Sequence, residues 1–370
     1  MNSKSSHNSS ALKVKANVIR TAQITDEIEI AWAQIRSSHV DYDSPYFSLD
    51  FVRAVDQIRS NVEIAVIRSQ ADQIIGFLPF QRMGHRKAEP VGGRLNDLHG
   101  IMSYPGLNFS TPNVLAQCRL KSFQFHSSPS CLSDSLSDFV FRYQGTHQID
   151  LSSGWEPYRA WIRKHSSTVK RQGQKTRALE KTGEVEFEFD CLDPDALEEL
   201  IALKRAKYQR TNTFDILSVK WASELLRKIH LSSTGDLQGI LSVIRLDGKM
   251  IAGHFGMTSG DMLHYWFPTF DVNFSRYSPG TELILRVAQS AAEKGFTTID
   301  FGYGDDAYKF KFCNVTTPAI CGRVESNPIS FQMAKCRFHV RNSLKDIPSL
   351  APAKAILRTV FPGFGQWNFK

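Results

Sequence analysis

Apolar and polar residues follow one another along this chain in two different periods, which predict strands and amphipathic helices. Residues 185–189 (VEFEF) alternate strictly, as expected for a strand with Val185, Phe187 and Phe189 facing inward. Residues 239–269 contain three apolar runs separated by Asp-Gly and Ser-Gly pairs, which are typical of two-residue hairpin turns. We therefore expect a three-stranded antiparallel meander in this part of the chain.

Helices are predicted where apolar residues recur at intervals of three or four. Asp193 and Pro194 are the residue types preferred at the N-cap and first position of a helix, and this helix should run to about Arg210. Another helix follows Ser278-Pro279-Gly280 and ends at Gly295, a residue type typical of helix C-termini. The meander, this second helix and the apolar strand after it predict an α/β layer with one mixed sheet.

The most distinctive stretch is 297–312, TTIDFGYGDDAYKFKF. A short apolar strand ends in a glycine-rich turn, so that Asp305, Tyr308 and Lys309 are presented at the strand end. The helix N-terminus at 278–280 lies just upstream, and such ends favour anions. A carboxylate, a phenol and an amine beside it predict a site that holds a phosphate and moves a proton. The alternative is that Asp305 caps the turn, Tyr308 packs and Lys309 is solvated.

A short internal repeat indicates two related halves. VIRSQADQIIGF, which starts at Val66, and VIRLDGKMIAGH, which starts at Val243, align without gaps. Two unrelated hairpins would give the same match, but each copy follows helices in its own half, which favours a tandem duplication. The predicted divisions are a disordered tail at 1–11, a first domain at 12–150, a second domain at 151–326 and a basic helical extension at 327–370.

Composition and charge narrow the function classes. The chain has 42% hydrophobic residues and no apolar run near 20 residues, so a globular cytoplasmic protein is expected. Its six cysteines form neither a CxxC pair nor a Cys/His cluster, so neither disulfides nor a metal site is expected. The segment 161–181 is strongly basic, and so is the chain after Ala334. Such segments attract phosphates, nucleic acid or anionic lipid, although a solvated helix face is as good an interpretation.

Four segments carry a resemblance to a known family: IAGHFGM, LHYWFPTFD, RYSPGTEL and IDFGYGDDAYKFKF. They resemble the C-terminal half of the CelD/BcsL-type acetyltransferases, tandem-GNAT proteins linked to bacterial exopolysaccharide and cellulose production and distantly similar to the FemAB peptidyltransferases. The resemblance covers about 151–312 well and the first half more loosely. It implies two GNAT-like α/β domains, each with a mixed, mostly antiparallel sheet and flanking helices, and the second holding the cofactor.

The resemblance also implies acyl transfer from acetyl-CoA or another acyl-CoA, without a metal. The implied anchor for the pyrophosphate consists of Tyr277, Ser278, Pro279, Gly280 and Thr281. The candidate catalytic residues are Asp305, Tyr308, His254 and Lys309. The candidate residues for acceptor binding are Asp97, His99, His264 and Trp266. Either strand histidine could instead be an interior packing residue, and Asp97 could cap a turn.

By resemblance, the acceptor is an amino or hydroxyl group of a sugar or polysaccharide precursor, and the polysaccharide synthesis machinery is a candidate partner. The usual GNAT signature, Gln/Arg-x-x-Gly-x-Gly/Ala, is reduced here to Gly280 alone. An aminoacyl-tRNA donor, as in the FemAB relatives, is therefore an alternative. In that case the basic segment 161–181 would bind the RNA. A third alternative is a non-catalytic GNAT-like binding module.

Overall fold

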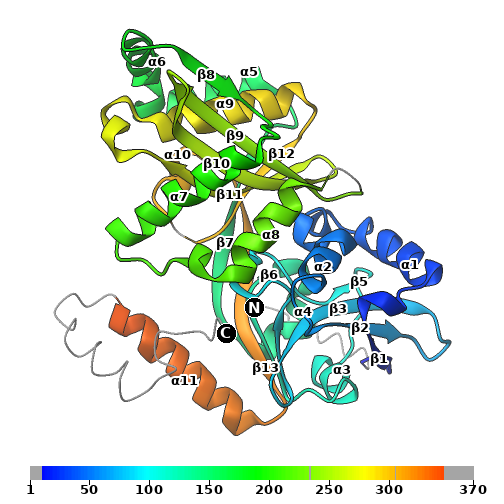
Figure 1. Cartoon of the computed structure of the whole chain (residues 1–370). Helices are drawn as coiled ribbons and strands as arrows, with labels where there is room; N and C mark the ends of the chain where they lie inside the picture. Colours follow the sequence, from blue (N-terminus) through cyan, green and yellow to red (C-terminus); the bar gives the residue numbers. More distant parts are fainter. Residues whose placement is uncertain (1–10, 233–234, 305, 346–370) are drawn as a thin grey trace, which may run out of the picture.

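The computed structural model describes residues 11–232, 235–304 and 306–345 (Figure 1). The strands are β1 (Lys15–Ile19), β2 (Val62–Arg68), β3 (Ile74–Met83), β4 (Lys87–Pro90), β5 (Met102–Ser103), β6 (Ser122–Pro129), β7 (Val140–Asp150), β8 (Val185–Glu188), β9 (Gln238–Leu246), β10 (Lys249–Ser259), β11 (Met262–Phe270), β12 (Thr298–Tyr303) and β13 (Val315–Glu325). The helices are α1 (Asp26–Arg36), α2 (Leu49–Asp56), α3 (Thr111–Gln117), α4 (Ser133–Leu136), α5 (Trp155–His165), α6 (Ser167–Glu180), α7 (Pro194–Arg210), α8 (Lys220–His230), α9 (Pro279–Glu293), α10 (Lys309–Phe312) and α11 (Pro328–Lys345).

The strands form one continuous, mostly antiparallel sheet in the order β1-β2-β3-β4-β6-β13-β7-β12-β11-β10-β9-β8, with β5 beside β3. The two halves of the chain exchange strands at its centre. Strand β7 pairs with β12 of the second half, and β13 pairs with both β6 and β7. Paired strands therefore join the residues before and after the predicted domain boundary at 150 and 151, and this boundary stays a prediction.

The predicted meander is confirmed as β9, β10 and β11, which pair antiparallel in chain order. Both copies of the internal repeat form antiparallel hairpins, β2–β3 in the first half and β9–β10 in the second. Each turn contains an aspartate with a left-handed backbone, Asp72 with φ of 65° and Asp247 with φ of 48°. The short repeat thus corresponds to the same local structure in both halves.

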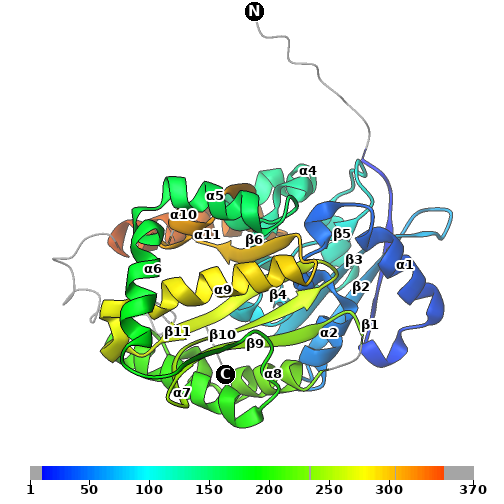
Figure 2. The same ribbon diagram turned by 90° about the horizontal axis from the view of Figure 1, so that it is seen from above.

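The meander is covered by helices on both faces, as Figure 2 shows: α9 lies on one side, and α7 and α8 lie on the other. Alternate residues of β9 accordingly enter two different cores. Ile240 and Ile244 pack with α9, whereas Leu241 and Val243 pack with α7 and α8. This double coverage fixes the end of β11, where the candidate site lies. Within the described residues, no helix is both long and apolar enough to cross a bilayer.

Candidate active site

Strands β11 and β12 run parallel and then diverge, and a cavity lies beside the end of β11. They pair only at three positions, 262–264 with 298–300. Beyond the last pair lies a cavity of about 290 Å³, lined by the end of β11, the 3-10 turn Val272–Tyr277, the start of α9, and Tyr308. Three regions that the sequence analysis singled out thus meet around one cavity.

Two unpaired hydroxyl groups belong to the lining of this cavity. Tyr265 and Thr269 are buried, and neither hydroxyl has a hydrogen-bond partner among the described residues. A buried polar group without a partner costs about 1–3 kcal/mol, so most such groups are satisfied by protein, water or a ligand. The two hydroxyls indicate that the cavity is built to receive a polar ligand.

The predicted anchor lies at the mouth of this cavity, at the start of α9. Ser278, Gly280 and Thr281 line the cavity, and Tyr277 and Pro279 are buried at the same turn. The N–H groups of Thr281 and Glu282 already donate to the carbonyl oxygen of Ser278. Because proline has no N–H, the Gly280 N–H is the donor of this first turn that remains for a ligand.

A lysine from the basic segment 161–181 adds positive charge to this anchor. Nζ of Lys175, on α6, donates to Oγ of Ser278 at 2.6 Å. Gln172 of the same helix donates to the carbonyl oxygen of Tyr277 at 3.2 Å, which fixes α6 against the start of α9. Lys207 of α7 also lines the cavity. The basic composition of 161–181 is evident in the sequence, but its contact with the anchor is not.

A buried imidazole joins the two halves of the chain next to the cavity. Nδ1 of His264 lies 2.9 Å from Oδ2 of Asp300, and its Nε2 lies 3.3 Å from Oδ2 of Asp97. The hydroxyl of Tyr46 lies 3.0 Å from the same Nε2. The side chain of His264 is fully buried, whereas that of Asp97 is 23% exposed. Asp97 is therefore the member of this Asp97–His264–Asp300 triad that an acceptor can reach.

The triad holds a charged imidazole at neutral pH. Burial by itself lowers the pKa of His264, but the hydrogen bonds to Asp300 and Asp97 outweigh it and raise the pKa to about 9. A protonated imidazole cannot serve as a free base, but it can hold the two carboxylates in place.

One glycine of the strand-end turn makes room for Asp97. Gly302 has a left-handed φ of +67°, and a Cβ there would lie 2.5 Å from Oδ2 of Asp97. Only glycine fits both conditions without strain. The first glycine of the strand-end turn thus allows the close approach of a carboxylate from the other half of the chain.

Tyr308 connects the triad with the cavity. Its side chain lines the cavity, and burial raises its pKa above the usual range, an effect to which the charges of Asp306 and Asp97 add. The phenol therefore stays protonated at neutral pH and can donate a hydrogen bond. Lys309 is buried beside it, and its Nζ donates to the carbonyl oxygen of Tyr303 at 2.5 Å. Asp305 lies outside the described residues.

The remaining predicted residues lie around these groups. His254 is buried and stacks on Tyr265 with 3.9 Å between ring centroids, and burial lowers its pKa well below the usual range. The ring of Trp266 lies 6.3 Å from that of His264. His99 is buried, and its Nε2 accepts the backbone N–H of His126 at 3.0 Å. Their predicted roles stay predictions.

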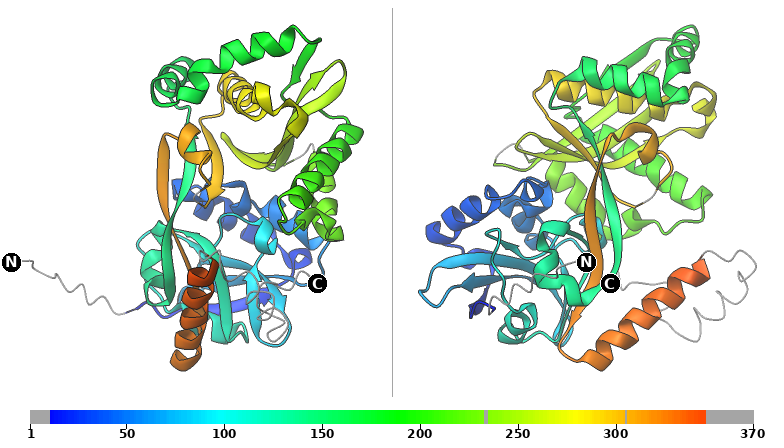
Figure 3. Two further views of the ribbon diagram at one scale, coloured as in Figure 1. Left: turned by 90° about the vertical axis from the view of Figure 1, so that its left-hand side faces the viewer. Right: turned by 180° about the vertical axis from the view of Figure 1, so that it is seen from behind.

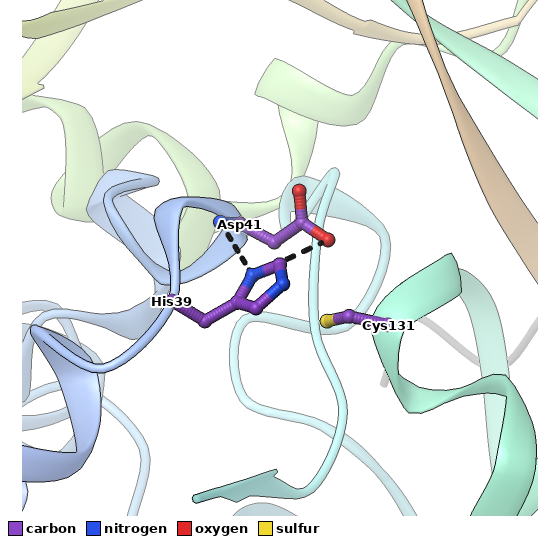
Figure 4. A group of neighbouring side chains, drawn as sticks. All are labelled: His39, Asp41 and Cys131. Atoms are coloured by element: carbon purple, nitrogen blue, oxygen red, sulfur yellow. Dashed lines mark hydrogen bonds and ion pairs between the residues drawn. The ribbon is translucent and has the colours of Figure 1, made fainter. Parts of the chain in front are cut away.

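One group of side chains in the described residues has the chemistry of a metal site (Figure 4). Single ligand atoms of His39, Asp41 and Cys131 all lie within 4.8 Å of one another. Nδ1 of His39, however, accepts the backbone N–H of Asp41 at 3.1 Å, and burial raises the pKa of the Cys131 thiol. These contacts are those of a hydrogen-bonded cluster, and none of the three residues lines the cavity.

Comparison with known proteins relates part of this chain to one protein family. Residues 166–310 match the family model of the acetyltransferase (GNAT) domain. No curated protein matches the chain significantly.

Three solved structures share the fold over most of the chain. FemX has 12% identity, a TM-score of 0.56, and coverage of 86% of this chain and 100% of its own. The C-terminal DUF2156 domain of a proposed lysylphosphatidylglycerol synthetase from Agrobacterium fabrum has 16% identity, a TM-score of 0.53, and coverage of 85% and 95%. A tandem GNAT protein from the clavulanic acid biosynthesis pathway has 8% identity, a TM-score of 0.50, and coverage of 85% and 99%. Residues 166–310 are thus similar to the acetyltransferase (GNAT) domain, and the chain as a whole shares the fold of a tandem GNAT protein.

Proposed function

We propose that this protein transfers an acyl group from acyl-CoA to an amino or hydroxyl group of an acceptor. The observation that carries the proposal is the cavity at the divergence of β11 and β12, with two unpaired hydroxyls in its lining and a helix N-terminus at its mouth. The Gly280 N–H and the Lys175 ammonium would hold the pyrophosphate of the donor. The hydroxyl groups of Tyr265 and Tyr308 are the candidate donors to the thioester.

The residues of the triad account for the proton transfers of this reaction. The acceptor nitrogen or oxygen attacks the thioester carbonyl carbon, and its proton passes to the Asp97 carboxylate, which His264 holds in place. When the carbon–sulfur bond breaks, the leaving thiolate takes a proton from the Tyr308 hydroxyl. Asp97 is thus the general base and Tyr308 the general acid, and His264 and Asp300 are positioning residues.

A second cavity, of about 350 Å³, is our candidate for the acceptor site. It is lined by Arg94, Arg142, His126 and the strand-end residue Tyr303, among others. The ring of Tyr303 lies 5.5 Å from that of His126, and burial, to which the charge of Asp97 adds, raises the pKa of Tyr303. Two guanidinium groups and polar side chains suit a sugar or polysaccharide precursor that carries a negative charge. The acceptor thus would approach Asp97 from the side opposite the donor, and the polysaccharide synthesis machinery remains our candidate partner.

A test of the anchor is the variant Gly280→Asp. A Cβ at this position lies 3.2 Å from Cδ1 of Phe270, so any side chain here presses slightly on that ring. The aspartate also places a negative charge at the proposed pyrophosphate site, and we expect CoA affinity to fall about tenfold or more by calorimetry. Gly280→Asn is the matched control because it has the same size without the charge. Equal CoA affinity in the two folded variants would contradict the anchor.

The alternative donor, aminoacyl-tRNA, is favoured by the fold shared with FemX and by the basic helices α5 and α6. The double variant Lys170→Glu/Arg171→Glu reverses two exposed charges of α6. If CoA is the donor, we expect acyl-CoA turnover to stay within about twofold of the parent, since neither Lys170 nor Arg171 belongs to the proposed anchor of Gly280 and Lys175. Lys220→Glu/Lys228→Glu on α8 is the control. Strong, salt-dependent tRNA binding that only the α6 variant loses would instead support the tRNA donor.

A further inference from the structure

Helix α11 is apolar on two opposite faces, of which the described residues cover only one. Phe331 and Phe338 face inward and contact the rings of Phe139 and Phe141 beside β7 and β13. Figure 3 shows α11 at one end of the molecule, apart from the helices that cover the meander. The inward face therefore accounts for the docking of α11, but not for the apolar residues on its other side.

The outward face carries a stripe of exposed apolar side chains. Ile329, Met333 and Val340 are 71%, 51% and 48% exposed, and Cys336, between them, is exposed as well. These positions follow Ile329 by four, seven and eleven residues, so they lie on one side of the helix. A continuous apolar stripe of this kind on an exposed helix marks a surface that binds something apolar.

The charge of the same segment is entirely positive. Residues 327–345 contain four basic residues, Lys335, Arg337, Arg341 and Lys345, and no acidic residue. Residues 327–370 contain seven basic residues and one acidic residue, a net charge of +6 within a chain of net charge +8. The sequence after α11 also contains Phe361, Phe364, Trp367 and Phe369. Aromatic and basic residues together are the composition of segments that bind the membrane interface.

We propose that α11 binds a lipid surface of net negative charge. A lipid surface uses both features of α11, because the acyl chains receive the apolar stripe and the headgroups attract the lysines and arginines. RNA would use only the charges and would gain nothing from Ile329 or Met333. A second copy of this chain would bring two positively charged segments together, which opposes self-association through this face.

The position of α11 relates this surface to the rest of the molecule. Phe338 and Asn342 of α11 also line the 350 Å³ cavity that contains Arg94 and Arg142. Lipid binding through α11 therefore brings this cavity close to the membrane surface. As a substrate class for the proposed acyl transfer, this favours acceptors carried at a membrane; this step rests on the proposed function, whereas lipid binding itself does not.

The test is co-sedimentation of the full chain with vesicles, which needs no enzymatic activity. We expect binding to vesicles of phosphatidylcholine with 30% phosphatidylglycerol, at least tenfold weaker binding to phosphatidylcholine alone, and loss of binding in high salt. Ile329→Glu and Met333→Glu should each weaken binding about tenfold, and Arg337→Glu about fivefold. Leu192→Glu is the matched control, because Leu192 is 72% exposed and lies far from α11 in the sequence. The variants change outward side chains, so melting temperatures should equal that of the parent.

Three outcomes would overturn the proposal. The first is equal binding of the parent, Ile329→Glu and Leu192→Glu to the anionic vesicles. The second is a parent protein that does not bind vesicles and is a dimer, together with a Met333→Glu variant that is a monomer. This result would assign the stripe to a contact with a second copy of the chain. The third is a parent that binds tRNA but not vesicles, with Arg337→Glu and not Ile329→Glu reducing the affinity. Failure of acyl transfer in any assay leaves the vesicle result unaffected, so the two proposals fail separately.

Discussion

Replacing Asp97 by asparagine should lower kcat about 10²- to 10⁴-fold, the usual cost of losing a general base. Asparagine keeps the size of the side chain and can still contact His264, but it cannot take the proton of the acceptor. Because Asp97 does not line the donor cavity, the affinity for acyl-CoA should stay near that of the parent. Single-turnover kinetics together with calorimetry would separate the two quantities.

The control for Asp97→Asn is Asp138→Asn, which neutralises an exposed carboxylate outside the proposed machinery. His264→Gln gives a companion test, since it removes the cation that orients Asp97, and we expect a smaller loss of kcat than in Asp97→Asn. A kcat for Asp97→Asn within about threefold of the parent, in a variant with the parent's melting temperature, would remove Asp97 from the reaction and leave it a structural link between the two halves.

The elements that could be predicted from the sequence are those with local causes. Helix α7 begins at Pro194 because the Asp193 side chain accepts the N–H of Asp195 and proline needs no partner there. The hairpin turn at Asp247-Gly248 has the left-handed angles that such a pair tolerates. The start of α9 was predicted from Pro279, which occupies the first position of that helix, although the Ser278 side chain makes no capping hydrogen bond. Each of these signals lies within a few residues, so no knowledge of the tertiary fold was needed.

The candidate site could be predicted only in part, because its parts are joined by tertiary contacts. His264 and Asp97 were singled out as members of one cleft, but the residues that complete the triad were not. Asp300 lies between apolar residues of a strand, and this pattern gives no indication that its carboxylate has a functional role. Tyr46 follows Pro45, and a proline in this segment predicts only that a helix is interrupted there. Their partnership with His264 depends on strand register and on the packing of one half against the other.

The exchange of strands at the sheet centre was also beyond sequence patterns. Hydrophobic alternation predicts that a segment is a strand, but it contains no information about which strand lies beside it. Strand β13 belongs to the second half in sequence and nevertheless pairs with β6 of the first. The two-domain prediction therefore describes the repeat in the sequence better than it describes the hydrogen bonding of the sheet.

Two buried basic side chains, His264 and Lys204, should make the free energy of unfolding depend on pH in opposite directions. The pKa of His264 is raised to about 9, so the folded protein binds more protons than the unfolded chain between about pH 6.5 and 9, and stability falls with rising pH in that window. Lys204 is buried, and its Nζ donates to the carbonyl oxygen of Pro268 at 2.8 Å. Burial lowers its pKa to about 7, so the unfolded chain binds more protons between about pH 7 and 10.5, and stability rises with pH there.

The two effects overlap and oppose each other between pH 7 and 9, and single variants should separate them. Relative to the parent, His264→Gln should gain about 2–3 kcal/mol in unfolding free energy on going from pH 7 to pH 9, because only the lysine effect remains. Lys204→Met, which keeps the length of the side chain, should lose a similar amount over the same interval. Urea unfolding at both pH values measures these differences, and groups common to all three proteins cancel. A difference between variant and parent that does not change with pH would show that the replaced side chain has the same pKa in the folded and unfolded states, and for His264 it would remove the charged imidazole from the triad.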